Sequence, residues 1–169
     1  MKTCAVFLLA ATLLAGPVAA ADLPAAIPPG SPPTAIDPAT GETVALDPAG
    51  GPMHVVFLAT WCRPCLTEIP KLFDLEDRWK ADGYRLVLVA VATRQSAERL
   101  REFRAQTQVP GRLLFDEHGS VAAAFGAATI PSHVLVDRRG GIVARAGALD
   151  PPFTQAVERL VRQEGRSKP

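Results

Sequence analysis

Two cysteines, Cys62 and Cys65, stand two residues apart in the segment ATWCRPCLTEIP (59–70), and the chain has only one other cysteine, Cys4. A pair at this spacing can form a structural disulfide, supply half of a metal site, or work as a redox pair. These three possibilities lead to different functions. The secondary-structure elements that position the two thiols indicate which of the three roles is preferred.

The cysteine pair lies where a predicted strand gives way to a predicted helix. The run HVVFLA (54–59) is continuously apolar, as expected of a buried central strand. Apolar residues then recur at helical spacing over 64–81, where Pro64 suits the first turn, Pro70 is expected to kink the helix, and Gly83 suits its end. Unpaired N–H groups and a partial positive charge at the helix N-terminus favour a thiolate at Cys62.

This placement suggests a division of labour between the two thiols. Cys62 would attack a partner disulfide, and Cys65, nearly one helical turn away and facing inward, would then attack Cys62 and release the partner reduced. A structural disulfide that closes a loop of about four residues would contribute only about 2 kcal/mol. The redox reading is therefore preferred, and the structural and metal readings stay as alternatives.

A zinc site normally needs four ligands, but the sequence has one CxxC and no paired histidines. We therefore expect no metal, and no cofactor besides the redox-active disulfide Cys62–Cys65. Because His54, His118 and His133 have no partner at catalytic spacing, they are expected to be structural.

The rest of the chain alternates between strand and helix. We expect a small hairpin over 34–46, strands over 85–92, 112–116, 133–137 and 141–147, and helices over 96–108, 120–126 and 152–164. The resulting order, β-α-β-α-β-α-β-β-α after the hairpin, predicts an α/β fold: a mixed central sheet with helices on both faces.

The first 21 residues have the pattern of a signal peptide: Lys2, a short apolar run over 5–14, and small residues over 18–21. We expect a cleaved signal and a periplasmic location; an uncleaved N-terminal membrane anchor is the alternative. Residues 22–33 are expected to be a Pro-rich leader, and 34–169 the folded domain. Removing Lys2 with the signal leaves 17 basic and 17 acidic side chains from the original 18 and 17, which argues against nucleic acid or an anionic membrane as partner.

The segment ATWCRPCLTEIPKL resembles the active-site segment of the TlpA/ResA/DsbE (CcmG) family of exported thiol-disulfide oxidoreductases. FDEHGSVAAAFGAATIPSHVLVDRRGGIVARAG looks like the second half of that family's domain, so the resemblance covers about residues 34–164. It implies a thioredoxin-like fold with an N-terminal β-hairpin extension. WCxxC followed by ExP, with a late TIP tripeptide, is a specific combination.

The resemblance also implies roles for single residues. Cys62 would be the exposed nucleophile, Cys65 the resolving thiol, and Pro131, after Ile130, a cis-proline lying against the disulfide. Glu68 would tune the cysteines and move protons, although it could instead be a solvated helix residue paired with Lys71.

Three residues beside the cysteines are expected to assist the pair. Trp61 would pack against the cysteine pair as one wall of the site. The charge of Arg63 would favour the thiolate, and Pro64 would fix the first turn of the helix. Two positions depart from related patterns. Leu58 replaces a usual tryptophan, and Val56 stands where cytoplasmic thioredoxins carry a buried aspartate, which makes Glu68 the more important proton acceptor.

The resemblance implies an enzyme that reduces cysteines of client proteins, in cytochrome c maturation or copper-centre assembly. Its partners would be client thiols or disulfides and a membrane thiol-electron donor, and it is expected to be a monomer. An oxidant or isomerase that installs disulfides is one alternative, although the helical insertion usual in that class is not evident. A metal-delivery module on the same scaffold is another. A peroxidase reading fails because it needs a single cysteine in a threonine-rich loop.

Overall fold

The computed structural model of the chain describes residues 25–28 and 30–165. Seven strands form one sheet in the order β2-β1-β5-β4-β3-β6-β7. The strands are β1 (Thr34–Ile36), β2 (Thr43–Ala45), β3 (Met53–Leu58), β4 (Arg85–Val91), β5 (Arg112–Asp116), β6 (Ser132–Val136) and β7 (Ile142–Ala146). The helices are α1 (Arg63–Trp79), α2 (Ala97–Gln106), α3 (Ser120–Ala124) and α4 (Pro151–Gly165), with short 3₁₀ turns at Pro48–Gly50 and Lys80–Asp82.

The sheet is mixed, as predicted. β3 pairs with β4 and β4 with β5 in parallel, whereas β6 runs antiparallel to β3, and β7 antiparallel to β6. The predicted N-terminal hairpin is β1 and β2, which joins the sheet where β1 pairs with β5. All six residues of β3 are buried, in accord with their unbroken apolar run.

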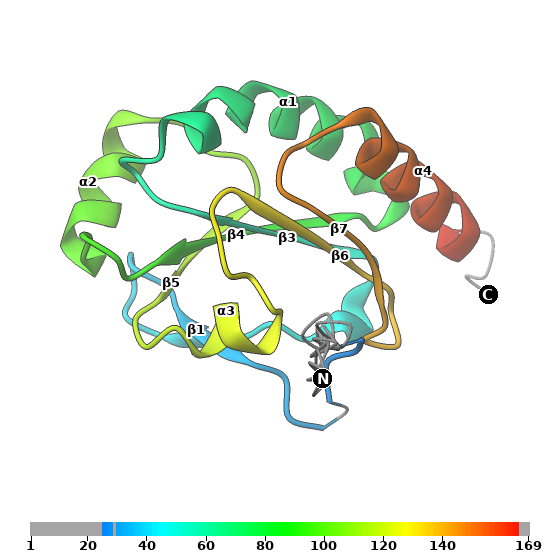
Figure 1. Cartoon of the computed structure of the whole chain (residues 1–169), viewed down its shortest axis with the longest axis horizontal. Coiled ribbons are helices and arrows are strands. Elements are labelled where there is room, and N and C mark those ends of the chain that lie inside the picture. Colours follow the sequence, from blue (N-terminus) through cyan, green and yellow to red (C-terminus); the bar gives the residue numbers. More distant parts are fainter. Residues whose placement is uncertain (1–24, 29, 166–169) are drawn as a thin grey trace, which may run out of the picture.

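Helices cover both faces of this sheet (Figure 1). α1, α2 and α4 lie over one face, where Leu72, Leu100 and Val157 join one hydrophobic cluster. α3 lies over the opposite face, where Val121 and Phe125 join a second cluster. The predicted α/β architecture, a mixed sheet between helical layers, is confirmed.

Helix α1 begins directly after its N-cap Cys62, contains Cys65, and continues without interruption through Pro70. It ends in a 3₁₀ turn, after which Gly83 adopts a left-handed conformation with φ 89°. Glycine tolerates that conformation at little cost, so the end of the helix falls near the residue predicted to stop it.

Part of the segment expected to be a Pro-rich leader is packed against the sheet. Ala26 forms a β-bridge with Gly141, and the amide of Ile27 donates a hydrogen bond to the Gly140 carbonyl at 2.8 Å. The Ile27 side chain is only 2% exposed and belongs to the second hydrophobic cluster. Ordered packing therefore begins before the hairpin, because Ile27 covers apolar side chains at the β6–β7 edge.

The predicted signal peptide (1–21) lies outside the described residues. Among the helices in the part of the chain that the structure describes, none is long and apolar enough to span a bilayer.

Candidate active site

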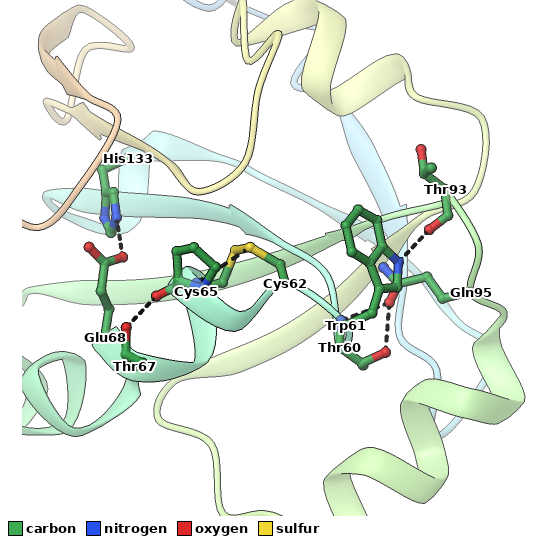
Figure 2. Close-up of a disulfide and its surroundings, with 10 residues drawn as sticks. Thr60, Trp61, Cys62, Cys65, Thr67, Glu68, Thr93, Gln95 and His133 are labelled. Atoms are coloured by element: carbon green, nitrogen blue, oxygen red, sulfur yellow. Dashed lines mark hydrogen bonds and ion pairs between the residues drawn. A yellow bond between two sulfur atoms is a disulfide. The ribbon is translucent and has the colours of Figure 1, made fainter.

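Cys62 and Cys65 form a disulfide at the point where β3 gives way to α1 (Figure 2). Cys62 is the N-cap residue of α1, and its Sγ accepts a hydrogen bond from the Cys65 backbone N–H at 3.4 Å. The sulfur of Cys62 therefore takes the place of the oxygen acceptor that usually caps a helix. This position stabilises negative charge on that sulfur, since the helix N-terminus carries a partial positive charge.

The difference in exposure expected between the two cysteines is absent from this disulfide form. Cys62 is 5% exposed and Cys65 3%, so the expectation of an exposed Cys62 is wrong for the oxidised state. The disulfide ties the Cys62 sulfur to Cys65, and both side chains join the hydrophobic cluster beneath α1. The two thiols are distinguished by their helix positions instead, the N-cap for Cys62 and the first turn for Cys65.

Trp61 is held beside the disulfide by the segment that follows β4. Its indole Nε1–H donates to the Thr93 carbonyl at 2.8 Å, and the Arg94 guanidinium carbon lies 4.0 Å from the ring centroid. The side chain is nevertheless 41% exposed. Arg63 and Pro64, the residues between the cysteines, are exposed as well. Trp61 therefore presents a fixed apolar surface to solvent next to Cys62.

The Ile130–Pro131 peptide bond is cis. It immediately precedes β6, and because β6 is antiparallel to β3, the first residue of β6 pairs near the end of β3, with Ser132 opposite Phe57. The TIP segment therefore lies at the same edge of the sheet as the disulfide.

An open groove with a volume of about 460 Å³ runs between this segment and Trp61. Its lining residues include Trp61, Thr93, Ala122, Ala127, Thr129 and Ile130. Most of these contribute apolar surface, and the groove is open to solvent beside Trp61.

Glu68 lies one helical turn after Cys65, and its carboxylate is turned toward the sheet (Figure 2). Its Oε2 lies 3.0 Å from His133 Nε2, and its Oε1 accepts a hydrogen bond from the Leu149 backbone N–H at 2.8 Å. The alternative of a solvated residue paired with Lys71 is therefore wrong. The side chain is 12% exposed, because α1 presents this face to the sheet and to the segment before α4.

His133 and His54 have buried polar partners that lie far from them in the sequence. His133 Nδ1 lies 3.0 Å from His54 Nε2, and His54 Nδ1 lies 2.6 Å from the Tyr84 hydroxyl. Both imidazoles are fully buried. The third histidine, His118, is 82% exposed and lies 3.9 Å from Glu117, outside this cluster.

Burial and neighbouring charges shift the pKa values of His54, His133 and Tyr84. Burial lowers the pKa of His54 well below its ordinary value, and the neighbouring His133 lowers it further. Burial also lowers the pKa of His133, although the Glu68 carboxylate partly opposes that shift. Burial raises the pKa of the Tyr84 phenol. All three shifts favour the neutral forms of the three rings.

Sequence spacing could not reveal this cluster. Glu68 and His133 are 65 residues apart, and His54 and His133 are 79 apart. The strand register brings the two histidines together: His133 pairs with Val56 and Leu135 pairs with His54, so the imidazoles are diagonal neighbours on one face. The available signal was that each histidine lies in a short, largely apolar run predicted to be a buried strand.

Among the described residues there is no group of three or more His, Cys, Asp or Glu side chains arranged to hold a metal ion. The cluster of Glu68, His133 and His54 is instead a linear series of hydrogen bonds.

Comparison with known proteins places this geometry in context. Residues 31–145 match the family model described as the AhpC/TSA family. No match was found among curated proteins.

Several solved structures have a similar fold. A proposed thiol:disulfide interchange protein DsbE from Chlorobium tepidum is 23% identical, with a TM-score of 0.69, over 85% of this chain and 98% of that one. MTB dsbF is 25% identical, with a TM-score of 0.64, over 77% and 99%. A secreted Mycobacterium tuberculosis disulfide oxidoreductase homologous to E. coli DsbE is 20% identical, with a TM-score of 0.62, over 75% and 95%.

Proposed function

We propose that this chain, which belongs to the AhpC/TSA family, is a thioredoxin-like thiol-disulfide oxidoreductase that works in the periplasm and reduces cysteines of client proteins. The observation that carries this proposal is the Cys62–Cys65 disulfide at the N-terminus of α1, beside an open apolar groove. The pattern of the first 21 residues supports export.

The proposed reaction exchanges one disulfide for another. In the reduced enzyme, the Cys62 thiolate attacks a client disulfide, forms a mixed disulfide and releases one client thiolate. Cys65 then loses its proton and attacks the Cys62 sulfur, which forms the Cys62–Cys65 bond and releases the second client sulfur as a thiolate. Two electrons pass to the client, and a membrane thiol-electron donor returns the enzyme to the dithiol form.

Several residues would assist this exchange. The α1 N-terminus and the Arg63 charge stabilise the departing or attacking Cys62 thiolate. Glu68, one turn from Cys65 on the same helix, would accept the proton that Cys65 loses. Pro131, with Ile130 before it, would position the client backbone along the groove, while Trp61 supplies its opposite wall.

The clients we propose are protein thiols that must be kept reduced outside the cytoplasm: the CxxCH pair of an apocytochrome c, or the cysteines of a copper centre. The rate at which the reduced enzyme exchanges with two peptides distinguishes these client classes. Faster exchange with a peptide that carries an oxidised CxxCH pair favours the apocytochrome, and faster exchange with an oxidised copper-site pair favours the copper centre.

The experiment is a mixed-disulfide trap with matched serine variants. Cys65→Ser leaves the nucleophile and removes the resolving thiol, so it should form a long-lived covalent complex with a client peptide. Cys62→Ser should form none. Equal trapping by both variants, or by neither, would contradict the proposed roles, and stable metal retention by the reduced protein would support the metal-delivery module instead.

A further inference from the structure

Four side chains form a continuous series of hydrogen bonds that ends at Glu68, one helical turn after Cys65. The Tyr84 hydroxyl lies 2.6 Å from His54 Nδ1, His54 Nε2 lies 3.0 Å from His133 Nδ1, and His133 Nε2 lies 3.0 Å from Glu68 Oε2. Tyr84 is 3% exposed, and both histidines are fully buried. Each donor in the series must therefore find its acceptor within it.

The two ends of the series determine the direction in which protons are donated. At one end, the Leu149 backbone N–H, which can only donate, already occupies Glu68 Oε1. At the other end, the Tyr84 hydroxyl has His54 as its hydrogen-bond partner among the described residues. If Tyr84 donates to His54 Nδ1, then His54 Nε2–H donates to His133 Nδ1, and His133 Nε2–H donates to the Glu68 carboxylate. Every buried N–H and O–H then has an acceptor.

The opposite direction leaves one donor without an acceptor. If Glu68 is protonated and donates to His133, each histidine must change tautomer, and His54 Nδ1–H must donate to the Tyr84 oxygen. The Tyr84 O–H then points into a buried environment without an acceptor in the described structure. Because an unsatisfied buried donor is costly, the first direction is favoured.

We propose that Tyr84, His54 and His133 are positioning residues that hold Glu68 as a carboxylate and so set the pH range in which Cys65 resolves the mixed disulfide. The proposal rests on the proposed function, in which Glu68 accepts the proton that Cys65 loses. The accepted proton passes from Glu68 to the departing client thiolate, so that the carboxylate is restored for the next exchange.

The other charged groups around the series lie at its edges. Asp150, in the turn before α4, acts on His133 through its charge, and Glu76 of α1 acts on Tyr84 in the same way. Phe153 of α4 packs against both imidazoles, with ring centroids 4.8 Å from His54 and 5.5 Å from His133. Phe153 carries no exchangeable proton, which makes it a packing control.

A first test reads the tautomers directly in the whole protein. Long-range ¹⁵N–¹H correlation spectra of the oxidised protein should show His54 and His133 neutral and protonated at Nε2, with exposed His118 as the reference signal. Nδ1–H tautomers at the two buried histidines would overturn the proposal, whether or not the protein exchanges disulfides.

A second test distinguishes a role of Tyr84 in holding the Glu68 carboxylate from a general effect of packing around the two histidines. The reduced protein is mixed with excess aromatic disulfide, which releases one coloured thiolate when Cys62 attacks and a second when Cys65 resolves. Tyr84→Phe removes the terminal donor, and the acid-side midpoint of the second phase should move upward by about one pH unit, a tenfold change in a protonation equilibrium. Phe153→Leu should leave that midpoint in place.

Glu68→Gln provides the coupling control. It should slow the second phase, and adding Tyr84→Phe to it should produce no further midpoint shift, because the two residues would act through the same carboxylate. A shift as large in Phe153→Leu, or one that persists in the Glu68→Gln background, would overturn the proposal. Absence of both phases in the unmodified protein would instead contradict the proposed function, and the tautomers would still decide whether the series has the inferred direction.

Discussion

At the scale of single residues, Cys62 and Cys65 have nearly the same exposure and differ in what surrounds them. Cys62 caps the N-terminus of α1, while Cys65 shares its helix with Glu68, one turn further on. The chemical difference between the thiols therefore comes from a helix end and a carboxylate. Both features depend on the position of a residue along α1, which is why the CxxC spacing matters.

Trp61 should contribute to client binding because it is an exposed aromatic side chain held rigidly beside the nucleophile. Trp61→Ala should lower the rate of exchange with a peptide client about tenfold, mainly through weaker binding, as expected when an aromatic anchor is truncated. Peptide concentration dependence in stopped-flow measurements checks this. Trp61→Phe is the matched control: it keeps an apolar ring, loses the bond to the Thr93 carbonyl, and should have a smaller effect. An unchanged rate in Trp61→Ala would show that clients bind elsewhere.

The residues that could be predicted from sequence were those whose signal is local. Cys62, Cys65 and Pro64 follow from spacing around one helix start, and Trp61, Ile130 and Pro131 were recognised within short motifs. The partners of Glu68 could not be predicted, because His133 and Leu149 reach it only after β6 and the segment before α4 have packed. Lys71 was a plausible partner by helical spacing, yet tertiary contacts turned Glu68 toward the sheet.

At the scale of secondary-structure elements, β3 and α1 form the unit that presents the disulfide. The strand pairs with β4 on one side and β6 on the other, and four residues, 59–62, separate the end of the strand from the start of the helix. The segment 25–28 packs against the turn between β6 and β7, where the amide of Ile27 donates a hydrogen bond to the Gly140 carbonyl. Gly140 permits this approach, since a Cβ there would lie 3.1 Å from the Ile27 carbonyl oxygen, at a backbone φ of +88°.

Ile27→Ala should destabilise the fold although it lies before the predicted domain boundary. Truncating a buried isoleucine costs about 2–5 kcal/mol of unfolding free energy, measured by denaturant titration. Val143→Ala is the control on β7, because Val143 is 48% exposed and its truncation should cost less than about 0.5 kcal/mol. Equal, small effects from both changes would contradict the packing of the N-terminal segment.

The order and type of the elements could be predicted because strand and helix periodicities are clear along the chain. The packing of residues 25–28 could not, since Pro-rich composition there indicates an extended chain but not what it contacts. Asp116 shows the same limit. It closes the predicted strand over 112–116, and that position does not indicate that it is 1% exposed and accepts hydrogen bonds from the amides of Val121 and Ala122 at the start of α3.

At the scale of the whole molecule, the buried histidines tie folding stability to pH. Their pKa values are lowered in the folded protein, so between those values and about 6.5 the unfolded chain binds more protons than the folded one. The unfolding free energy should therefore be highest above about pH 6.5 and fall as the pH decreases, by up to about 1.4 kcal/mol per pH unit for each histidine.

Denaturant titrations at a series of pH values check this dependence. Tyr84→Phe keeps both histidines and should keep a comparable slope below neutral pH, whereas His133→Asn should lose one histidine's share of it. A slope that is the same in His133→Asn and in the unmodified protein would contradict the assignment, and the acidic side chains would then account for the dependence.

The direction of electron flow is the central claim about the molecule as a whole, and the reduction potential of the Cys62–Cys65 pair tests it most directly. The purified protein is equilibrated in dithiol buffers of known potential, with Cys62→Ser and Cys65→Ser as controls. A reductant should have a potential near the thioredoxin value of about −270 mV, and a value near about −120 mV would identify a disulfide donor and contradict the proposed direction.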